Sequence, residues 1–174
     1  HNDDHFYRGI RGPVGSGKSV MCAIEILRRA QEQAPDKFGI RRTRFAVIRN
    51  TYRELLDTTI KTFHDWIPES IGVFSRPDMS FPITQLPGVE CEILFRALDR
   101  PDDAKKLLSL ELTAAWINEA REIPKSIVDL LATRVGRFPP KYQTGGPTWF
   151  GIWMDTNPPD DDSWWYEMFE DRRP

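Results

Sequence analysis

The chain has few cysteines and few histidines, and each shortage argues against a class of protein. Its 174 residues include two cysteines, Cys22 and Cys91, which lie far apart in the sequence. Two distant cysteines favour buried reduced thiols over a disulfide-stabilised fold. The three histidines, at positions 1, 5 and 64, share no metal-ligand spacing with each other or with the cysteines. A histidine or cysteine metal centre is therefore disfavoured.

Long apolar stretches and an excess of one charge are also missing. No apolar run approaches the ~18 residues of a membrane-spanning helix, and no signal peptide is visible. The net charge of -2 creates no basic field, so any contact with nucleic acid must come from a local patch or from a ring of subunits. Hydrophobic residues make up 40% of the chain, enough for the core of one domain. We expect a soluble intracellular protein that consists of one domain or is a fragment of a larger one.

The strongest motif is the segment GPVGSGKS, which fits the phosphate-binding pattern G-x-x-x-x-G-K-[ST] at each fixed position. Its glycines allow a tight turn that aims backbone N–H groups at phosphate oxygens, beside the positive end of the next helix. Lys18 would meet the β- and γ-phosphates as a point charge, and the Ser19 hydroxyl would ligate Mg²⁺. We assign the nucleotide contacts to Gly12, Pro13, Val14, Gly15, Ser16, Gly17, Lys18, Ser19 and Val20.

The sequence around this motif supports the assignment. Residues 6–10 alternate like a strand, and residues 20–30 have apolar side chains at helical spacing, which is the order that a phosphate loop requires. A glycine-rich turn that fits the pattern by chance is the alternative.

Strands and helices alternate along the rest of the chain, which indicates an α/β fold. We predict a P-loop NTPase domain over residues 1–174, of the type with an additional strand and a catalytic glutamate, built on a mainly parallel sheet flanked by helices. We expect strands at residues 43–49, 112–118 and 148–155, helices at 52–66, 100–109 and 126–135, and a β-hairpin near 78–97 whose second arm enters the main sheet. The acidic and aromatic tail predicts a last helix, which either packs on the domain or leads into another.

A second polar pair, Asn118 and Glu119, follows the apolar strand near 112–118. A strand that delivers two polar side chains to the carboxyl edge of a sheet, beside a phosphate loop, resembles a Walker B element. Glu119 would polarise the attacking water, and Asn118 would hold Mg²⁺ directly or through water. The usual residue at the metal position is aspartate, so either Mg²⁺ depends mainly on Ser19 and the phosphates or hydrolysis is slow. The alternative is that the pair only caps the strand and starts the next helix.

Four segments, GPVGSGKS, RNTYRELLDTTIKTF, LTAAWINEAREIP and MDTNPPDDDSWW, carry a resemblance to a known family. In their order and residue pattern these segments resemble those of the ATPase domain of the large terminase subunit of tailed bacteriophages. This subunit is the motor that pumps DNA into the capsid. The resemblance spans nearly the whole chain. It implies that Thr156 and Asn157 couple hydrolysis to movement, although Thr-Asn-Pro-Pro taken alone is a turn. It also implies a C-terminal nuclease domain that these residues do not include, so we expect ATP hydrolysis without DNA cleavage.

The resemblance further implies the cofactors and partners. ATP and Mg²⁺ would be the cofactors, and double-stranded DNA would be gripped by its backbone without regard to sequence. The portal protein and the small terminase subunit would be partners, with a homo-oligomeric ring on assembly, a monomer in isolation and no membrane. The implied location is the host cytoplasm during virion assembly, and not the mature virion.

ATPase rings often complete their site with a basic residue from a neighbouring subunit. The sequence offers two sets of candidates and favours neither: Arg134 and Arg137, or Arg100, Lys105 and Lys106.

For the other arginines the sequence allows two alternative roles each. Arg49 resembles the arginine of the family's RNT segment and either faces the nucleotide or caps the sheet and a helix. The cluster Arg41, Arg42 and Arg44 either contacts DNA phosphates or forms ordinary surface.

Two other functions stay open on the sequence. One is another P-loop ATPase or a helicase-like motor, although no further helicase motif is visible. The other is a nucleotide-binding switch or assembly module with little hydrolysis, which Asn118 suggests. A small-molecule kinase is disfavoured because no arginine-rich lid is evident.

Overall fold

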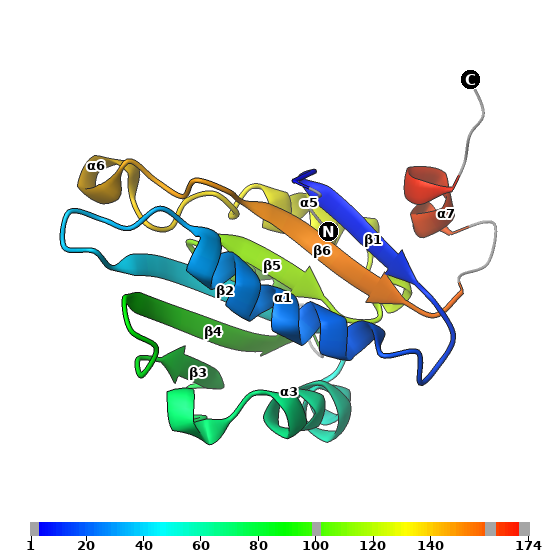
Figure 1. Cartoon of the computed structure of the whole chain (residues 1–174). Helices are drawn as coiled ribbons and strands as arrows, with labels where there is room; N and C mark the ends of the chain where they lie inside the picture. The colour runs from blue at the N-terminus through cyan, green and yellow to red at the C-terminus, as the bar shows by residue number, and fades with distance from the viewer. Residues whose placement is uncertain (1–3, 99–101, 159–162, 171–174) are drawn as a thin grey trace.

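The computed structural model describes residues 4–98, 102–158 and 163–170, which form one six-stranded sheet with helices on both faces (Figure 1). The strand order is β1-β6-β5-β2-β4-β3. All neighbouring strands are parallel except β3 and β4. The strands are β1 (Tyr7–Arg11), β2 (Arg41–Arg49), β3 (Ser80–Ile83), β4 (Val89–Ala97), β5 (Ala114–Ile117) and β6 (Gly151–Thr156). The mainly parallel sheet and the hairpin within residues 78–97 are confirmed.

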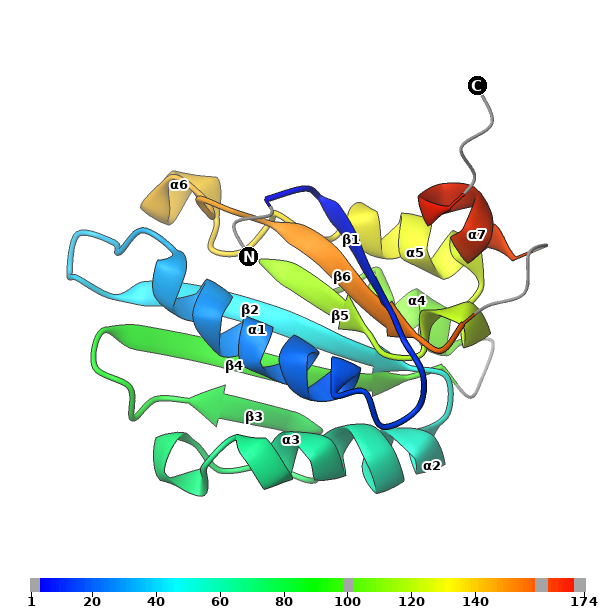
Figure 2. The same cartoon turned by 45° about the vertical axis from the view of Figure 1, so that its right-hand side comes forward.

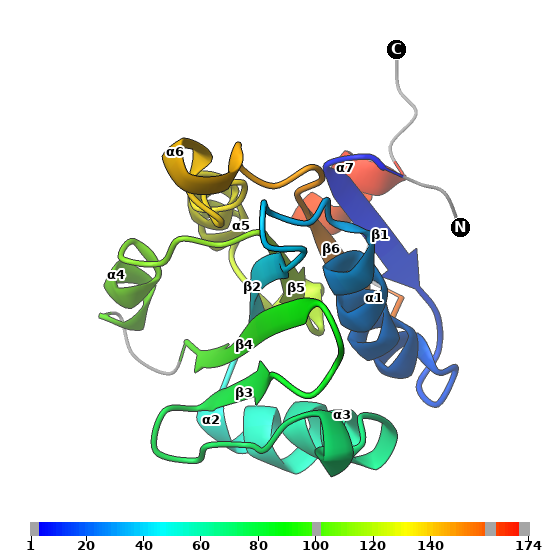
Figure 3. The same ribbon diagram turned by 60° about the vertical axis from the view of Figure 1, so that its left-hand side comes forward.

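Helices cover both faces and one edge of the sheet. They are α1 (Lys18–Glu32), α2 (Tyr52–Glu54), α3 (Lys61–Trp66), α4 (Asp103–Leu107), α5 (Lys125–Ala132), α6 (Lys141–Thr144) and α7 (Trp164–Phe169). Helices α2 and α3 run along the β3 side of the sheet (Figure 2), and α1 lies on the opposite side from α4 and α5 (Figure 3). Within the described part of the chain, none of the helices combines the length and the apolar character that crossing a bilayer requires.

The predicted helix at 52–66 contains a π-helical turn, Leu55–Ile60, between α2 and α3. The extra residue in such a turn shifts the side chains that follow and is often found at functional sites. Thr59 lies in this turn, and its side chain is buried.

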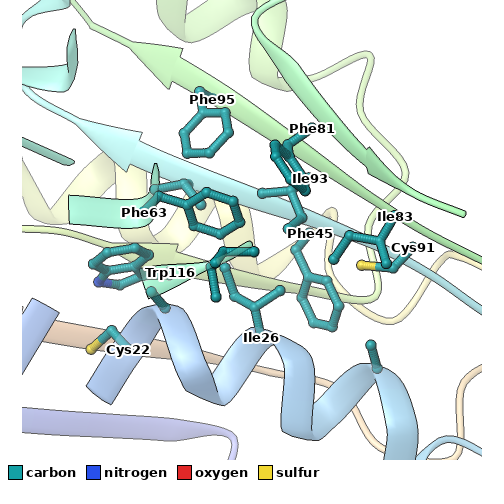
Figure 4. Packing of buried hydrophobic residues seen from close by; sticks show 14 of the residues in the cluster. Cys22, Ile26, Phe45, Phe63, Phe81, Ile83, Cys91, Ile93, Phe95 and Trp116 are labelled. Atoms are coloured by element: carbon teal, nitrogen blue, oxygen red, sulfur yellow. The ribbon is translucent and has the colours of Figure 1, made fainter. Parts of the chain in front are cut away.

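Side chains that alternate along the strands build two cores. On β2, Phe45 and Val47 belong to the core under α1 and α3, whereas Ala46 and Ile48 belong to the core under α4, α5 and α7. Figure 4 shows Cys22 and other side chains of α1 against the residues of the first core. Strands covered on both faces are continuously apolar, which explains their sequence pattern.

The two cysteines are free and buried, so the prediction of reduced thiols is confirmed. Burial raises the pKa of the Cys91 thiol to about 12. Such a thiol stays protonated and unreactive at neutral pH.

Parallel pairing brings the ends of several strands to one edge of the sheet. Strand β6 lies between β1, which leads into the phosphate loop, and β5, which leads into Asn118 and Glu119. Ile10 pairs with Asp155, and Ile117 pairs with Met154. The residues that end β6 are therefore placed between the two predicted halves of the site.

The backbone of Gly72 lies close to that of Pro82 in β3, and this contact allows a test of the packing around the hairpin. A Cβ atom on Gly72 would lie 2.2 Å from the carbonyl oxygen of Pro82, so neither backbone can stay in place if Gly72 is replaced. We expect Gly72→Ala to lower the free energy of unfolding by at least about 2 kcal/mol in urea. The control is Ser70→Ala, a change at an exposed position two residues away. Equal stability of Gly72→Ala and the unmodified protein would contradict the packing described.

A cluster of arginines on one carboxylate makes stability depend on pH. Burial alone would raise the pKa of Glu25, but hydrogen bonds from Arg28, Arg8 and Arg29 outweigh it and hold the pKa at about 2. A depressed folded-state pKa contributes stability at neutral pH that is lost as the pH falls from about 4.5 toward 2.

We therefore expect Glu25→Gln to cost roughly 2–3 kcal/mol at pH 7 and about half as much at pH 3, measured by urea unfolding. Glu32→Gln is the matched control, because Glu32 lies on the same helix with a half-exposed side chain. A cost of Glu25→Gln that is the same at both pH values would disprove the electrostatic origin.

Candidate nucleotide-binding site

Two glycines of the loop between β1 and α1 are required by its backbone geometry, and a third is closely packed. Gly15 and Gly17 have φ angles of 77° and 81°, in the left-handed region that favours glycine. A Cβ atom on Gly12 would lie 2.9 Å from Ser16 Oγ. Helix α1 begins directly after Gly17, which caps it without a side-chain hydrogen bond. The first N–H groups of this 15-residue helix therefore point toward the loop, as an anion site requires.

Lys18 connects the phosphate loop to the segment after β6. Its side chain is buried, and its Nζ donates to the carbonyl oxygens of Gly12 at 2.8 Å and Pro13 at 2.9 Å and to Asn157 Oδ1 at 3.1 Å. Phosphate oxygens would compete for these same N–H donors. Binding of a nucleotide and the contact with Asn157 are therefore linked through one ammonium group.

Glu119 has an unusual backbone conformation. Its φ angle is 51°, which is uncommon for a residue with a side chain and costs on the order of 1–3 kcal/mol. Its Oε2 accepts a hydrogen bond from the backbone N–H of Asn157 at 3.2 Å. Asn157 thus contacts both Lys18 and Glu119, and the two predicted halves of the site lie side by side.

Asn118 is buried, and its amide orientation is fixed by its neighbours. Its Oδ1 accepts from Thr59 Oγ1 at 2.7 Å, while its Nδ2 donates to Ser19 Oγ at 3.2 Å and to both carboxylate oxygens of Asp155 at 3.1 Å. The predicted metal role of Asn118 depends on an amide oxygen facing Ser19. In this arrangement the Asn118 amide turns its N–H group, and not its oxygen, toward Ser19. This orientation does not supply the expected oxygen ligand, and the metal role of position 118 stays a prediction.

Asp155 is the residue of this site that the sequence reasoning missed. Its side chain is fully buried, and its Oδ2 accepts from Ser19 Oγ at 3.0 Å while its Oδ1 accepts from Trp116 Nε1 at 2.7 Å. Burial raises the pKa of Asp155, against the hydrogen bonds from Trp116, Asn118 and Ser19 that lower it. The available signal was an acidic residue at the end of an otherwise apolar strand.

The two predicted coupling residues both contact the phosphate loop. The backbone oxygen of Thr156 accepts from the N–H of Gly12 at 3.3 Å, and the side chain of Asn157 accepts from Lys18. The Oγ1 of Thr156 is buried and has no hydrogen-bond partner among the described residues. A change in the loop therefore reaches β6 through two direct contacts.

Arg49 is held by acidic side chains at the end of β2. Its Nη1 lies 2.9 Å from Glu122 Oε2 and 3.5 Å from the carbonyl oxygen of Asn118, and its Nη2 lies 3.4 Å from Glu54 Oε1. These contacts match the capping alternative. The other alternative, that Arg49 faces the nucleotide, stays a prediction.

The candidates for a trans-acting basic residue bond to other parts of the chain. Arg134 and Arg137 lie beside Leu112, at the amino end of β5 and hence at the edge opposite the phosphate loop. Lys105 and Lys106 are exposed and form ion pairs with Asp102 and Asp103 of the same segment. Arg100 lies outside the described residues. The trans-acting role of each of these residues stays a prediction.

Two arginines of the cluster predicted to contact DNA have acidic partners. Arg42 forms ion pairs with Asp36 and Glu90, and Arg44 forms one with Glu92. These partners offset much of the positive charge and favour the ordinary-surface alternative.

Comparisons with solved structures agree with the fold. The large terminase of a thermophilic bacteriophage matches with a TM-score of 0.75 and 15% identity, over 95% of this chain and 37% of that one. The complex of that terminase with ATP-γ-S matches with a TM-score of 0.69, 15% identity and coverage of 95% and 36%. The large terminase ATPase domain of Thermus phage P74-26 matches with a TM-score of 0.59 and 17% identity, over 97% and 66%.

The bacteriophage Phi-29 viral genome packaging motor assembly also matches, with a TM-score of 0.60 and 13% identity, over 98% of this chain and 49% of that one. At these identities the matches show the P-loop NTPase fold. The chain spans little more than a third of the length of the thermophilic bacteriophage's large terminase.

Comparison with curated protein sequences gave no match. The model of the family described as phage terminase large subunit matches residues 4–173, nearly the whole chain. This match agrees with a phosphate loop and a carboxylate that meet at the end of β6, and the chain belongs to the phage terminase large subunit family.

Proposed function

We propose that this chain is an ATPase domain whose hydrolysis of ATP powers the movement of double-stranded DNA into a viral procapsid. The observation that carries the proposal is the contact of Asn157 with both Lys18 and Glu119, because it places a phosphate-binding cation and a carboxylate on two sides of one position. The thermophilic bacteriophage terminase bound to ATP-γ-S and the Phi-29 packaging motor assembly support it.

The residues of the chain divide the chemistry among them. Loop N–H groups and Lys18 bind the β- and γ-phosphates, and Glu119 orients the attacking water as a general base. Phosphate oxygens draw Lys18 away from Asn157, so arrival and loss of the γ-phosphate change the bonding at the end of β6. This exchange is the step that couples chemistry to movement.

The surroundings of Ser19 fit a magnesium ion. The Ser19 hydroxyl lies 3.0 Å from Asp155 Oδ2, and hydroxyl and carboxylate oxygens are the ligands that Mg²⁺ prefers. When bound, Mg²⁺ would neutralise phosphate charge. Ser19 would hold it together with a neighbouring side chain and the phosphates.

We also propose how the domain acts together with DNA and other proteins. DNA is gripped through its backbone by a ring of subunits, which assembles with the portal protein and the small terminase subunit in the host cytoplasm. A basic residue of a neighbouring subunit completes each site. These 174 residues do not cut DNA and are monomeric in isolation.

Two single substitutions test the site. We expect Glu119→Gln to keep ATP binding but lower phosphate release about 10²- to 10⁴-fold, because the general base is lost. Lys18→Ala should lose both ATP binding and phosphate release. The matched controls are Glu69→Gln and Lys37→Ala, which make the same changes at exposed positions.

Turnover that is unchanged in both site variants would refute the assignment. Tight ATP binding by the unmodified protein with no phosphate release would favour a nucleotide-binding switch instead.

A second pair of variants tests the coupling contact. Asn157→Ala removes an acceptor of Lys18 and leaves the backbone N–H on Glu119, so Lys18 is freer to meet phosphate. We expect ADP affinity, measured by isothermal titration calorimetry, to rise severalfold. Thr156→Val should leave ADP affinity unchanged and keep or raise stability, by up to about 1 kcal/mol, because it removes an unpaired buried hydroxyl. A weaker affinity of Asn157→Ala would show that Asn157 binds the nucleotide rather than competing with it.

A further inference from the structure

We propose that Asp155 supplies the carboxylate of the magnesium site, in place of the aspartate that position 118 lacks, and that Asn118 is a positioning residue for it. This inference rests on the proposed function. It names a metal-site residue on β6 rather than on the Walker B strand β5.

Asp155 lies directly beside Ser19. Asp155 Oδ2 accepts the hydroxyl hydrogen of Ser19 at 3.0 Å, so the two oxygen ligands already lie together. Asp155 follows Trp153 by two residues on β6 and therefore faces α1, at whose first turn Ser19 lies. The insertion of β6 between β1 and β5 makes this placement possible.

The hydrogen bonds around Asn118 have a fixed direction. A carboxylate accepts hydrogen bonds and cannot donate them, so the Asn118 amide must turn its Nδ2 toward Asp155. The hydroxyl of Thr59, in the π-helical turn, then donates to the remaining Oδ1 at 2.7 Å. Asn118 orients the carboxylate and has no free oxygen on that side.

The negative charge of Asp155 has no positive partner in its hydrogen bonds to the described residues. Asp155 is fully buried, and its partners among the described residues are the neutral donors Ser19, Trp116 and Asn118. A buried carboxylate without a cation is costly. A divalent cation beside Ser19 would supply the missing positive charge. The metal would then have one hydroxyl ligand, from Ser19, and one carboxylate ligand, from Asp155. The carboxylate would come from β6 instead of from the end of β5.

The test measures metal binding apart from activity. Mn²⁺, as a stand-in for Mg²⁺, is titrated by electron paramagnetic resonance into the protein with ADP bound, and ADP affinity is measured separately in EDTA. We expect Asp155→Asn to weaken Mn²⁺ binding about 10- to 100-fold and to leave ADP affinity in EDTA unchanged. The matched control is Asp129→Asn, the same change at an exposed site on α5. Unchanged Mn²⁺ binding in Asp155→Asn would overturn the inference.

A double variant separates the role of charge from that of packing. Asn118→Asp with Asp155→Asn keeps the hydrogen bonds and reverses the donor and acceptor between the two positions. Its carboxylate stands at position 118, directly after β5 and beside Ser19, so we expect Mn²⁺ binding to recover at least about tenfold over the single variant. A double variant that folds and still binds Mn²⁺ weakly would overturn the inference, since the loss in Asp155→Asn would then come from packing.

The unmodified protein provides the test if Asp155→Asn does not fold. Electron–nuclear double resonance of bound Mn²⁺ with ¹³C-labelled aspartate should show a carbon coupling, and its absence would overturn the inference. Failure of the proposed function looks different. In that case the unmodified protein would not bind ADP in EDTA, or Lys18→Ala would bind it equally well.

Discussion

The structure depends on the parallel insertion of β6 between β1 and β5. This pairing brings the last residues of β6 against the phosphate loop on one side and the Walker B segment on the other. Asp155 then reaches Ser19, Thr156 reaches Gly12, and Asn157 reaches both Lys18 and Glu119. Without β6 in this place, the two motifs would keep the hydrogen bond from Asn118 to Ser19 but lose the contacts made through Asp155 and Asn157.

Much of the fold and half of the site could be predicted because their signals are local. The phosphate loop is a run of eight residues whose glycines are needed for its own turns, and apolar periodicity marks the strands and helices. Strand order is set by pairing between distant segments, and no local pattern reveals it. This limit explains why Asp155 was expected only as the end of the strand at 148–155. The π turn at Leu55–Ile60 was missed for another reason, because it lies within a helix whose apolar spacing predicts only a regular helix.

The position of Asp155 also changes how the departure at position 118 is understood. From the sequence, an asparagine there suggests a weakened metal site or slow hydrolysis. In three dimensions the amide of Asn118 lies between Thr59 and Asp155, where it orients a carboxylate that comes from the adjacent strand. A carboxylate and a hydroxyl then still lie together at Ser19, although the carboxylate belongs to residue 155 and not to residue 118.

The most direct test of the central claim is a crystal structure of the chain with Mg²⁺, ADP and a γ-phosphate mimic such as aluminium fluoride. The account predicts the mimic between Lys18 Nζ and the carboxylate of Glu119, with Lys18 displaced from Asn157. A mimic bound with Glu119 remote from it, or outside the loop of residues 12–19, would contradict the account.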